Sequence, residues 1–231
     1  MKTKMNVKRL LAVSLAAMMT ATAFAGCGNS GGSSSDSKAD SASTGTPMTN
    51  EEIIKKAAAE GKIGNWGLGN EYEILALLQK YDLPTTYLSQ DFTMDGFDQD
   101  DITLASAMSF NELGLVINDY DGGYKYGDTV GTIDMNDEGV AMLEDNIFCT
   151  KEFAKNNPNT VKAFVYASMK GWKYAVENPE EAAQIVFDAG SSVSSDHQLY
   201  MAQQVAKLVS TDTKGNAVSD YGNMDEEAMQ Q

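Results

Sequence analysis

Short β-type segments alternate with helical segments over residues 49–134, and this alternation constrains the fold of the chain more than any other feature. The helical segments repeat apolar residues every three or four positions. A helix between two strands carries the chain back across a sheet, so the strands it joins can pair in parallel. The sequence therefore predicts an α/β fold with a parallel or mixed sheet. The expected strands are residues 62–66, 85–89, 102–108 and 129–134, and the expected helices are residues 53–60, 71–81 and 109–117.

The chain becomes helical after residue 149. Pro, Ser or Thr stands at the start of several of the later segments, as is typical of helix N-termini. An apolar stretch at residues 140–148 precedes them. We expect a C-terminal helical block with helices at residues 150–156, 158–177, 179–189 and 194–209.

The first 26 residues are organised like an export signal. Four basic residues and no acid precede an apolar run, and small residues follow it. The run is too short for a permanent membrane span. The sequence FAGC at residues 24–27 resembles the bacterial lipobox, in which the signal is cut before a Cys that receives a lipid. We therefore expect residues 1–26 to be a signal peptide and Cys27 to be lipidated; the alternative is a plain signal peptide with Cys27 as a stray thiol.

Residues 27–48 are expected to be the lipidated Cys followed by a flexible tether. They are mostly Gly, Ser, Ala, Asp and Thr, which bury too little apolar surface to offset the entropy of ordering. Such a chain would be anchored to the outer face of the cell membrane. Lipidation of Cys27 would leave Cys149 without a disulfide partner, and we expect Cys149 to be a small buried apolar residue.

The charge of the chain excludes one class of partner. The formal net charge is −16 at pH 7, and it is more negative still without the basic N-terminus. Such a field repels nucleic acid, so we expect no nucleic-acid partner.

No motif in the sequence indicates catalysis. The only histidine, His197, follows Asp196 in a polar helical segment, where we expect it to be solvated. The acidic runs at residues 98–101 and 134–138 lack the spacing of a calcium loop. We therefore expect no catalytic residue, no metal site and no cofactor.

The segment at residues 66–73 is the best candidate for binding. Its glycines let a ligand approach the backbone closely, and the helix that follows offers free N–H donors. Trp66 and Tyr72 could stack on a flat ring, while Glu71 and Glu73 could accept hydrogen bonds from it. Glycine is also common at any strand-to-helix turn, so the spacing alone leaves a purely structural role open.

Five segments of the chain, taken in order, resemble one family. They closely resemble bacterial ABC-transporter substrate-binding lipoproteins related to the fungal thiamine pyrimidine precursor synthase. The resemblance extends from residue 61 to about residue 209. The segments are KIGNWGLGNEYEILALL, SQDFTMDGF, ASAMSFNELGLV, TIDMNDEGVAMLEDNIF and KAFVYASMKGWKYAVENPEEAAQIV.

The resemblance implies a type II periplasmic-binding-protein-like fold, in which two α/β lobes close on a ligand. Residues 49–231 would form the solute-binding domain. Residues 49–138 would be mainly one near-complete lobe, and residues 139–231 would be a partial other lobe rich in C-terminal helices. Family members usually carry a longer segment before the glycine turn, so the N-terminal part of lobe one would be missing here. The C-terminus would be missing too, because residues 225–231 end within an expected helix without a capping residue. Apolar faces that should meet that segment are then expected to be exposed.

The resemblance further implies a binding protein for a small nitrogen heterocycle, such as a pyrimidine precursor of thiamine, which delivers it to ABC permease subunits. One alternative is a binding-incompetent fragment or interaction module that needs a partner chain. Another is a pyrimidine-synthesis enzyme, although the fungal relatives use a His and a Cys-rich motif that are not matched here. The expected ligand-binding residues are Trp66, Gly67, Gly69, Asn70, Glu71, Tyr72, Asn111, Glu112 and Glu138.

Overall fold

A computed structural model describes residues 9–13, 47–143, 145–212, 214–224, 226 and 228–230. Cys27, the tether up to residue 46 and most of the expected export signal lie outside the described residues.

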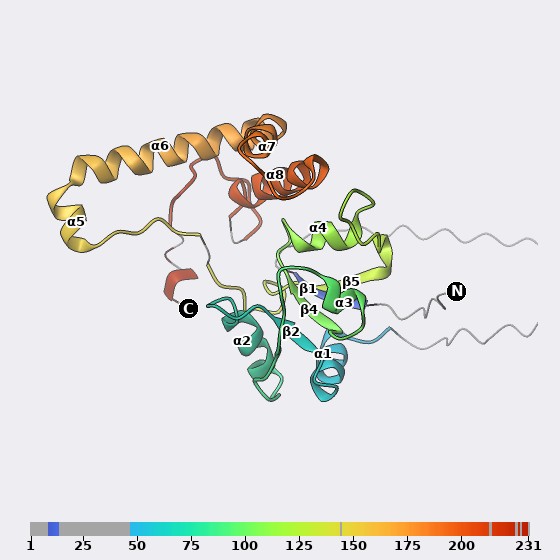
Figure 1. Ribbon diagram of the computed structural model, residues 1–231. Helices are drawn as coiled ribbons and strands as arrows, with labels where there is room; N and C mark the ends of the chain where they lie inside the picture. Colours follow the sequence, from blue (N-terminus) through green and yellow to red (C-terminus); the bar gives the residue numbers. More distant parts are fainter. Residues whose placement is uncertain are drawn as a thin grey trace, which may run out of the picture.

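The described strands form one five-stranded sheet with the order β3-β2-β4-β1-β5 (Figure 1). Every pairing in this sheet is parallel, which agrees with the predicted α/β class. Each expected strand is present, although β3 has only two residues. The strands are β1 (Arg9–Val13), β2 (Ile63–Asn65), β3 (Leu88–Ser89), β4 (Leu104–Ala107) and β5 (Val130–Ile133).

Strand β1 comes from the segment that the sequence assigns to an export signal. Its backbone pairs with β4 on one side and β5 on the other, and Leu10 lies opposite both Leu104 and Gly131. The sequence did not predict this strand. A central parallel strand is a continuous apolar run, and so is the apolar part of an export signal, so composition does not distinguish the two.

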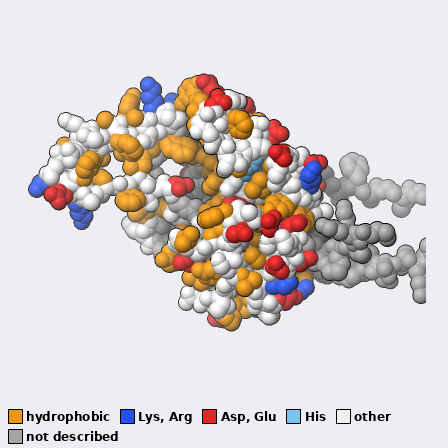
Figure 2. Space-filling view, viewed as in Figure 1, with side chains coloured by type: hydrophobic (Ala, Val, Ile, Leu, Met, Phe, Trp, Pro, Cys, Tyr) orange, Lys and Arg blue, Asp and Glu red, His pale blue; other side chains and the backbone are white. Residues whose placement is uncertain are grey.

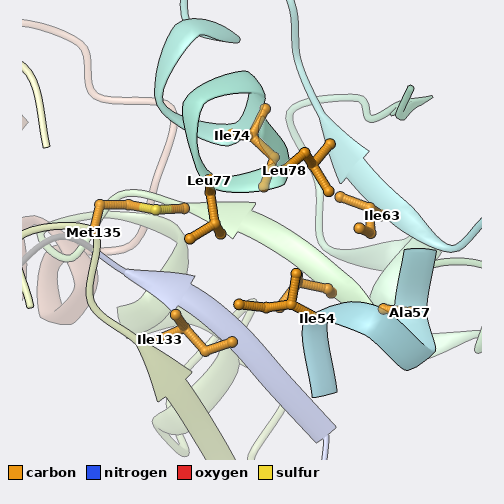
Figure 3. Packing of buried hydrophobic residues seen from close by; sticks show 9 residues of the cluster. Ile54, Ala57, Ile63, Ile74, Leu77, Leu78, Ile133 and Met135 are labelled. Carbon is orange, nitrogen blue, oxygen red and sulfur yellow. The ribbon is translucent and has the colours of Figure 1, made fainter. Parts of the chain in front are cut away.

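Helices cover both faces of the sheet. Helices α1 (Asn50–Ala59) and α2 (Tyr72–Lys80) lie on one face, and α3 (Asp95–Asp98) and α4 (Glu112–Ile117) lie on the other. Figure 3 shows side chains of α1 and α2 converging with those of β2 and β5. The second face is packed by Met94 and Phe97 from the α3 side, together with Ile102, Ala105, Ala107 and Val116.

Helix α1 begins with a capping box, which the residues Thr49-Asn50-Glu51-Glu52 display in the sequence. The Thr49 hydroxyl accepts a hydrogen bond from the Glu52 backbone N–H, and the Glu52 carboxylate accepts one from the Thr49 N–H at 2.8 Å. This reciprocal pair satisfies two donors that a helix start leaves without partners.

The four helices of the expected C-terminal block are all present. They are α5 (Lys151–Asn156), α6 (Pro158–Glu177), α7 (Pro179–Asp188) and α8 (Ser195–Val209), and short 3-10 turns occur at Gly127–Thr129 and Ala228–Gln230. Helix α8 packs against α6 and α7, and it also packs against α4 of the α/β part. None of these described helices is long and apolar enough to cross a bilayer.

Helix α6 extends away from the sheet, and none of its 20 residues is buried (Figure 1). Hydrophobic side chains gather along α6 and α7 in Figure 2. This exposure agrees with the expectation that apolar faces lack a covering layer. The large apolar side chains exposed on these two helices are Phe164, Val165, Tyr166, Trp172, Tyr174, Ile185, Val186 and Phe187.

Residues 140–149 connect β5 to the helical block without forming a helix or strand in their described part. The Met142 N–H donates to the Glu73 carboxylate at 2.8 Å, which holds the start of this segment against α2. Further along, residues 145–150 are all exposed, Cys149 among them. The prediction that Cys149 is buried is therefore wrong, because it assumed that the apolar stretch around it joins a core.

Candidate functional site

The candidate site lies at the carboxyl ends of β2 and β4, which are neighbours in the sheet. After β2 the chain runs outward to β3, and after β4 it crosses to β5 on the other side. The connections therefore leave the two strand ends in opposite directions and open a crevice between them. In open α/β sheets this switch point is where ligands bind.

The turn after β2 has an unusual backbone. Gly67, Leu68 and Gly69 have φ values of 69°, 59° and 96°, so three consecutive residues are left-handed. The positive φ at both glycines agrees with the reading of this turn from the sequence. Leu68 is the strained residue of the three, because a residue with a Cβ is unfavourable in the left-handed region. Such backbone strain concentrates at functional sites.

A buried polar network holds this turn on the strands. The Asn65 side-chain oxygen accepts a hydrogen bond from the Gly67 N–H at 2.7 Å, and its amide group donates to the Ser106 hydroxyl at 2.9 Å. Gln90 joins β4 through two bonds with the Ser106 backbone, at 2.8 and 3.1 Å. Because this network links the ends of β2 and β4, it fixes the turn against the sheet.

Two adjoining cavities occupy the crevice. The inner one encloses about 20 Å³, which is room for about one water molecule. The outer one is open to solvent and has a volume of about 210 Å³, which suits a single small ring rather than a large ligand. The inner cavity is lined by Asn65, Trp66, Asn70, Glu73, Ile74, Ser106, Ala107, Met108 and Met135, and the outer one by Trp66, Gly67, Leu68, Asn70, Phe92, Met108 and Glu112.

The outer cavity combines aromatic walls with two polar groups. Trp66 and Phe92 supply aromatic surface, and the buried Trp66 indole N–H has no hydrogen-bond partner among the described residues. Glu112 is only 5% exposed, and one of its oxygens accepts a hydrogen bond from the Met108 N–H at 2.9 Å. Burial raises the pKa of the Glu112 carboxyl, and its hydrogen bonds oppose that shift. The cavity thus presents aromatic surface and one buried carboxyl to a ligand.

Four of the expected ligand-binding residues line these cavities, namely Trp66, Gly67, Asn70 and Glu112. Gly69 and Glu71 belong to the adjoining turn, where the Gly69 N–H donates to the Glu71 carboxylate at 2.7 Å. Tyr72, expected to stack on a ring, is 58% exposed at the start of α2 and lines neither cavity. Asn111 stands behind Glu112, where its amide donates to the other carboxylate oxygen at 2.9 Å.

Glu138, also expected to contact the ligand, lies elsewhere. Its carboxylate accepts hydrogen bonds from Lys80, Tyr81 and Asn50 at 2.7, 2.6 and 3.0 Å. Burial raises the pKa of Glu138, but these hydrogen bonds outweigh the burial, and the pKa lies below its usual value. In the structure Glu138 ties the start of α1 and the end of α2 to the loop after β5.

Three residues that line the outer cavity were not expected from the sequence: Leu68, Phe92 and Met108. The inner cavity adds five more unexpected residues, namely Asn65, Ile74, Ser106, Ala107 and Met135. Phe92 follows β3 and reaches the cavity only because β3 pairs with β2. Met108 directly follows β4, so a rule that strand ends line the site would have found it.

The position of His197 corrects another expectation. His197 is completely buried, where the sequence predicted a solvated side chain. The start of α8 packs on α4, and the His197 ring lies between Tyr120 and Tyr200 with centroid distances of 5.5 and 6.1 Å. Burial lowers the pKa of His197. Within the part of the chain that the structure describes, no group of three or more His, Cys, Asp or Glu side chains could hold a metal ion.

Comparison with known proteins adds one finding. A family model described as NMT1/THI5 like matches residues 59–182, which is just over half of the chain. The matched range contains every residue that lines the two cavities. A comparison with curated proteins gave no match.

Proposed function

Because the chain belongs to the NMT1/THI5-like family, we propose that it is an extracytoplasmic solute-binding protein of an ABC importer. Its ligand would be a small nitrogen heterocycle, such as a pyrimidine precursor of thiamine. The observation that carries this proposal is the cavity of about 210 Å³ at the switch point of the sheet, with two aromatic walls and a buried carboxyl.

The cavity suits such a ligand for three reasons. A flat ring can stack on Trp66 or Phe92. The Glu112 carboxylate can accept a hydrogen bond from an amino group on the ring. The volume of about 210 Å³ admits a single small ring.

The export and anchoring part of the proposal rests on the sequence. The FAGC motif and the polar segment that follows it support lipidation at Cys27 and display of the folded part outside the cell. Permease subunits would then receive the ligand at the membrane face. Replacement of Cys27 by Ala should release the protein from the membrane fraction, and a Cys27→Ala variant that stays membrane-bound in high salt would oppose this part.

A ligand screen tests the binding part. Thermal melting of the full chain is measured with pyrimidines, thiamine and flavin precursors. A ligand at one hundred times its dissociation constant should stabilise the fold by about 2.7 kcal/mol. The proposal expects a shift with an aminopyrimidine and little effect from thiamine, which is larger than a single ring. No shift with any of these compounds would oppose it.

The exposed apolar surface of α6 and α7 favours a second candidate, an interaction module whose helices are covered by a partner chain. Analytical ultracentrifugation distinguishes the two. A chain that binds no heterocycle but self-associates, and that becomes monomeric when Phe164 and Trp172 are changed to Ser, would support the interaction module.

A further inference from the structure

A continuous series of hydrogen bonds runs from the helical block to the cavity. The Tyr120 hydroxyl lies 2.5 Å from His197 Nδ1, and His197 Nε2 lies 2.8 Å from Asn111 Oδ1. Asn111 Nδ2 then donates to Glu112 Oε1 at 2.9 Å. The sequence predicted that Asn111 and Glu112 both contact the ligand, but only Glu112 lines a cavity.

The geometry determines which histidine nitrogen carries the proton. Because the Asn111 amide nitrogen donates to Glu112, the Asn111 oxygen faces His197 and must accept from it. His197 Nε2 therefore carries a proton. A neutral ring then has a bare Nδ1, which accepts from the Tyr120 hydroxyl. Burial raises the pKa of Tyr120, so this hydroxyl stays protonated and can donate.

We propose that His197 and Asn111 are positioning residues, which orient the Glu112 carboxylate for the ligand only while α8 is docked on α4. The proposal deepens the proposed function, because it concerns the same cavity. Asn111 has its oxygen and its nitrogen engaged on opposite sides, so it transmits the position of His197 to Glu112 and is not free for a ligand. The second oxygen of Glu112 is held by the Met108 N–H, which leaves the Asn111 bond as the contact that depends on α8.

The groups around His197 make this contact sensitive to acid. Tyr120 from the loop after α4 and Tyr200 from α8 itself flank the ring, and both are neutral. The neighbouring residue Asp196 is exposed on α8, and Glu112 is linked to the ring only through Asn111. No carboxylate among the described residues contacts the imidazole directly, so a protonated ring would be a buried cation without an anionic partner.

The sign of the pH effect follows from the direction of the shift. Burial lowers the pKa of His197 from its ordinary value of 6.5, so the docked state binds the proton less readily than the undocked state. Docking of α8 is therefore fully favoured above pH 6.5. It weakens as the pH falls below 6.5 and through the lowered pKa.

Four variants of the full chain test the proposal. His197→Ala and Asn111→Ala each break the series. His197→Gln keeps a donor at the place of Nε2 but does not titrate, so it should rescue the bond to Asn111. Tyr200→Phe is the matched control: it removes the hydrogen bond from Tyr200 to the Ser109 carbonyl at 2.8 Å, which joins α8 to the segment just before α4, and leaves the series intact.

The first measurement is the affinity for the thiamine pyrimidine precursor by calorimetric titration at pH 7.5 and 5.5. His197→Ala and Asn111→Ala should each weaken binding about tenfold at pH 7.5, as expected for one charge-assisted hydrogen bond. Tyr200→Phe should bind like the unchanged protein. Between pH 7.5 and pH 5.5 the unchanged protein should lose more affinity than His197→Gln does. Titration of Glu112 affects both proteins, so the difference between them reports on His197. Equal losses for Tyr200→Phe and His197→Ala would overturn the proposal.

The second measurement needs no ligand. The chain has two tryptophans, so Trp172→Phe leaves Trp66, which lines the cavity with Glu112, as the only reporter. Its acrylamide quenching should change in His197→Ala and Asn111→Ala but not in Tyr200→Phe. If the unchanged protein binds no pyrimidine but shows this pattern, the proposed ligand class fails and the positioning role stands. If quenching is the same in all variants, the positioning role fails.

Discussion

Two aromatic side chains of the candidate site, Phe92 and Tyr72, are both largely exposed but differ in position. Phe92 is 75% exposed and lines the outer cavity, while Tyr72 is 58% exposed and lines neither cavity. Truncating either side chain to Ala should therefore destabilise the fold little. A difference in ligand affinity between the two variants then reports on ligand contact.

Phe92→Ala should weaken binding of the pyrimidine, because it removes a stacking face worth about 0.5–1.5 kcal/mol. Tyr72→Ala is the matched control and should bind normally. Calorimetric titration beside thermal melting measures both effects. If Tyr72→Ala weakens binding as much as Phe92→Ala, the cavity is not where the ligand stacks, and the turn itself would hold it.

Glu138→Gln should lower stability and leave binding unchanged. The Glu138 side chain is 8% exposed, and the substitution removes the charge that strengthens its hydrogen bonds to Lys80 and Tyr81. Its carboxyl pKa is lowered in the folded state, so its contribution is present above the unfolded pKa and is lost as the pH falls through the folded value. Denaturant unfolding at pH 7 and pH 3 should show a larger difference from the unchanged protein at pH 7 than at pH 3. A loss of ligand affinity in Glu138→Gln would contradict this assignment.

The residues of the site differ in how far the sequence alone could predict them, because the positions of some depend on contacts between distant elements. Trp66 and Gly67 follow directly from the glycine turn, which the sequence displays. Phe92 belongs to a loop whose approach to the turn depends on the pairing of β2 with β3, and a lone exposed Phe has no periodic signal. His197 appears polar in a helical segment, and only the docking of α8 on α4 buries it. Sequence patterns describe one element at a time, so contacts between elements are where they fail.

At the scale of elements, the contact between α4 and α8 depends on a glycine. Gly114 lies in α4, and a Cβ added there would overlap the Tyr200 ring of α8. Glycine is unfavourable within a helix by about 1 kcal/mol relative to alanine, so its presence here is explained by the close approach of Tyr200.

Gly114→Ala should therefore act in opposite directions on helix α4 and on its contact with α8. The substitution favours helix α4 locally but pushes Tyr200 away, so α8 should undock while the sheet stays folded. Hydrogen exchange should show faster exchange in α8 and unchanged protection in β2 and β4. Uniform protection in Gly114→Ala would mean that Tyr200 moves aside without cost and that Gly114 does not govern the contact.

Helices were easier to predict from the sequence than strands. The Thr49 capping box and the Pro at the start of α6 and α7 mark helix starts by local chemistry, and the structure has helices beginning there. Strand β3 has only two residues, because its pairing with β2 is limited to Gly64 with Leu88 and Asn65 with Ser89. Residues 140–148 are an apolar stretch in the sequence, yet residues 141–143 and 145–148 are exposed in the structure. Apolar composition allows a segment to be buried, but burial also requires another element that packs against it.

At the scale of the whole molecule, residues 9–13 belong both to the sheet and to the expected export signal. They complete the sheet between β4 and β5. Processing before Cys27 would remove β1 and leave the facing backbone groups of β4 and β5 without partners. Unpaired strand edges of this kind favour association with another chain.

A chain that starts at Cys27 should consequently melt at a lower temperature than the full chain, or should self-associate. Thermal melting and analytical ultracentrifugation of the two chains measure this. A shorter chain that is monomeric and melts at the same temperature as the full chain would show that residues 9–13 contribute nothing to the folded part.

The central claim is that the crevice at the ends of β2 and β4 binds a small nitrogen heterocycle through Glu112. Calorimetric titration of the thiamine pyrimidine precursor into the full chain and into Glu112→Gln tests it most directly. Gln keeps the size of the side chain but removes the charge, and the loss of a charged hydrogen bond costs about 1.5–3 kcal/mol. We predict that the unchanged chain binds one ligand. Glu112→Gln should bind it with an affinity lower by a factor on the order of ten or more. Absence of binding to the unchanged chain, or equal affinity in Glu112→Gln, would contradict the account.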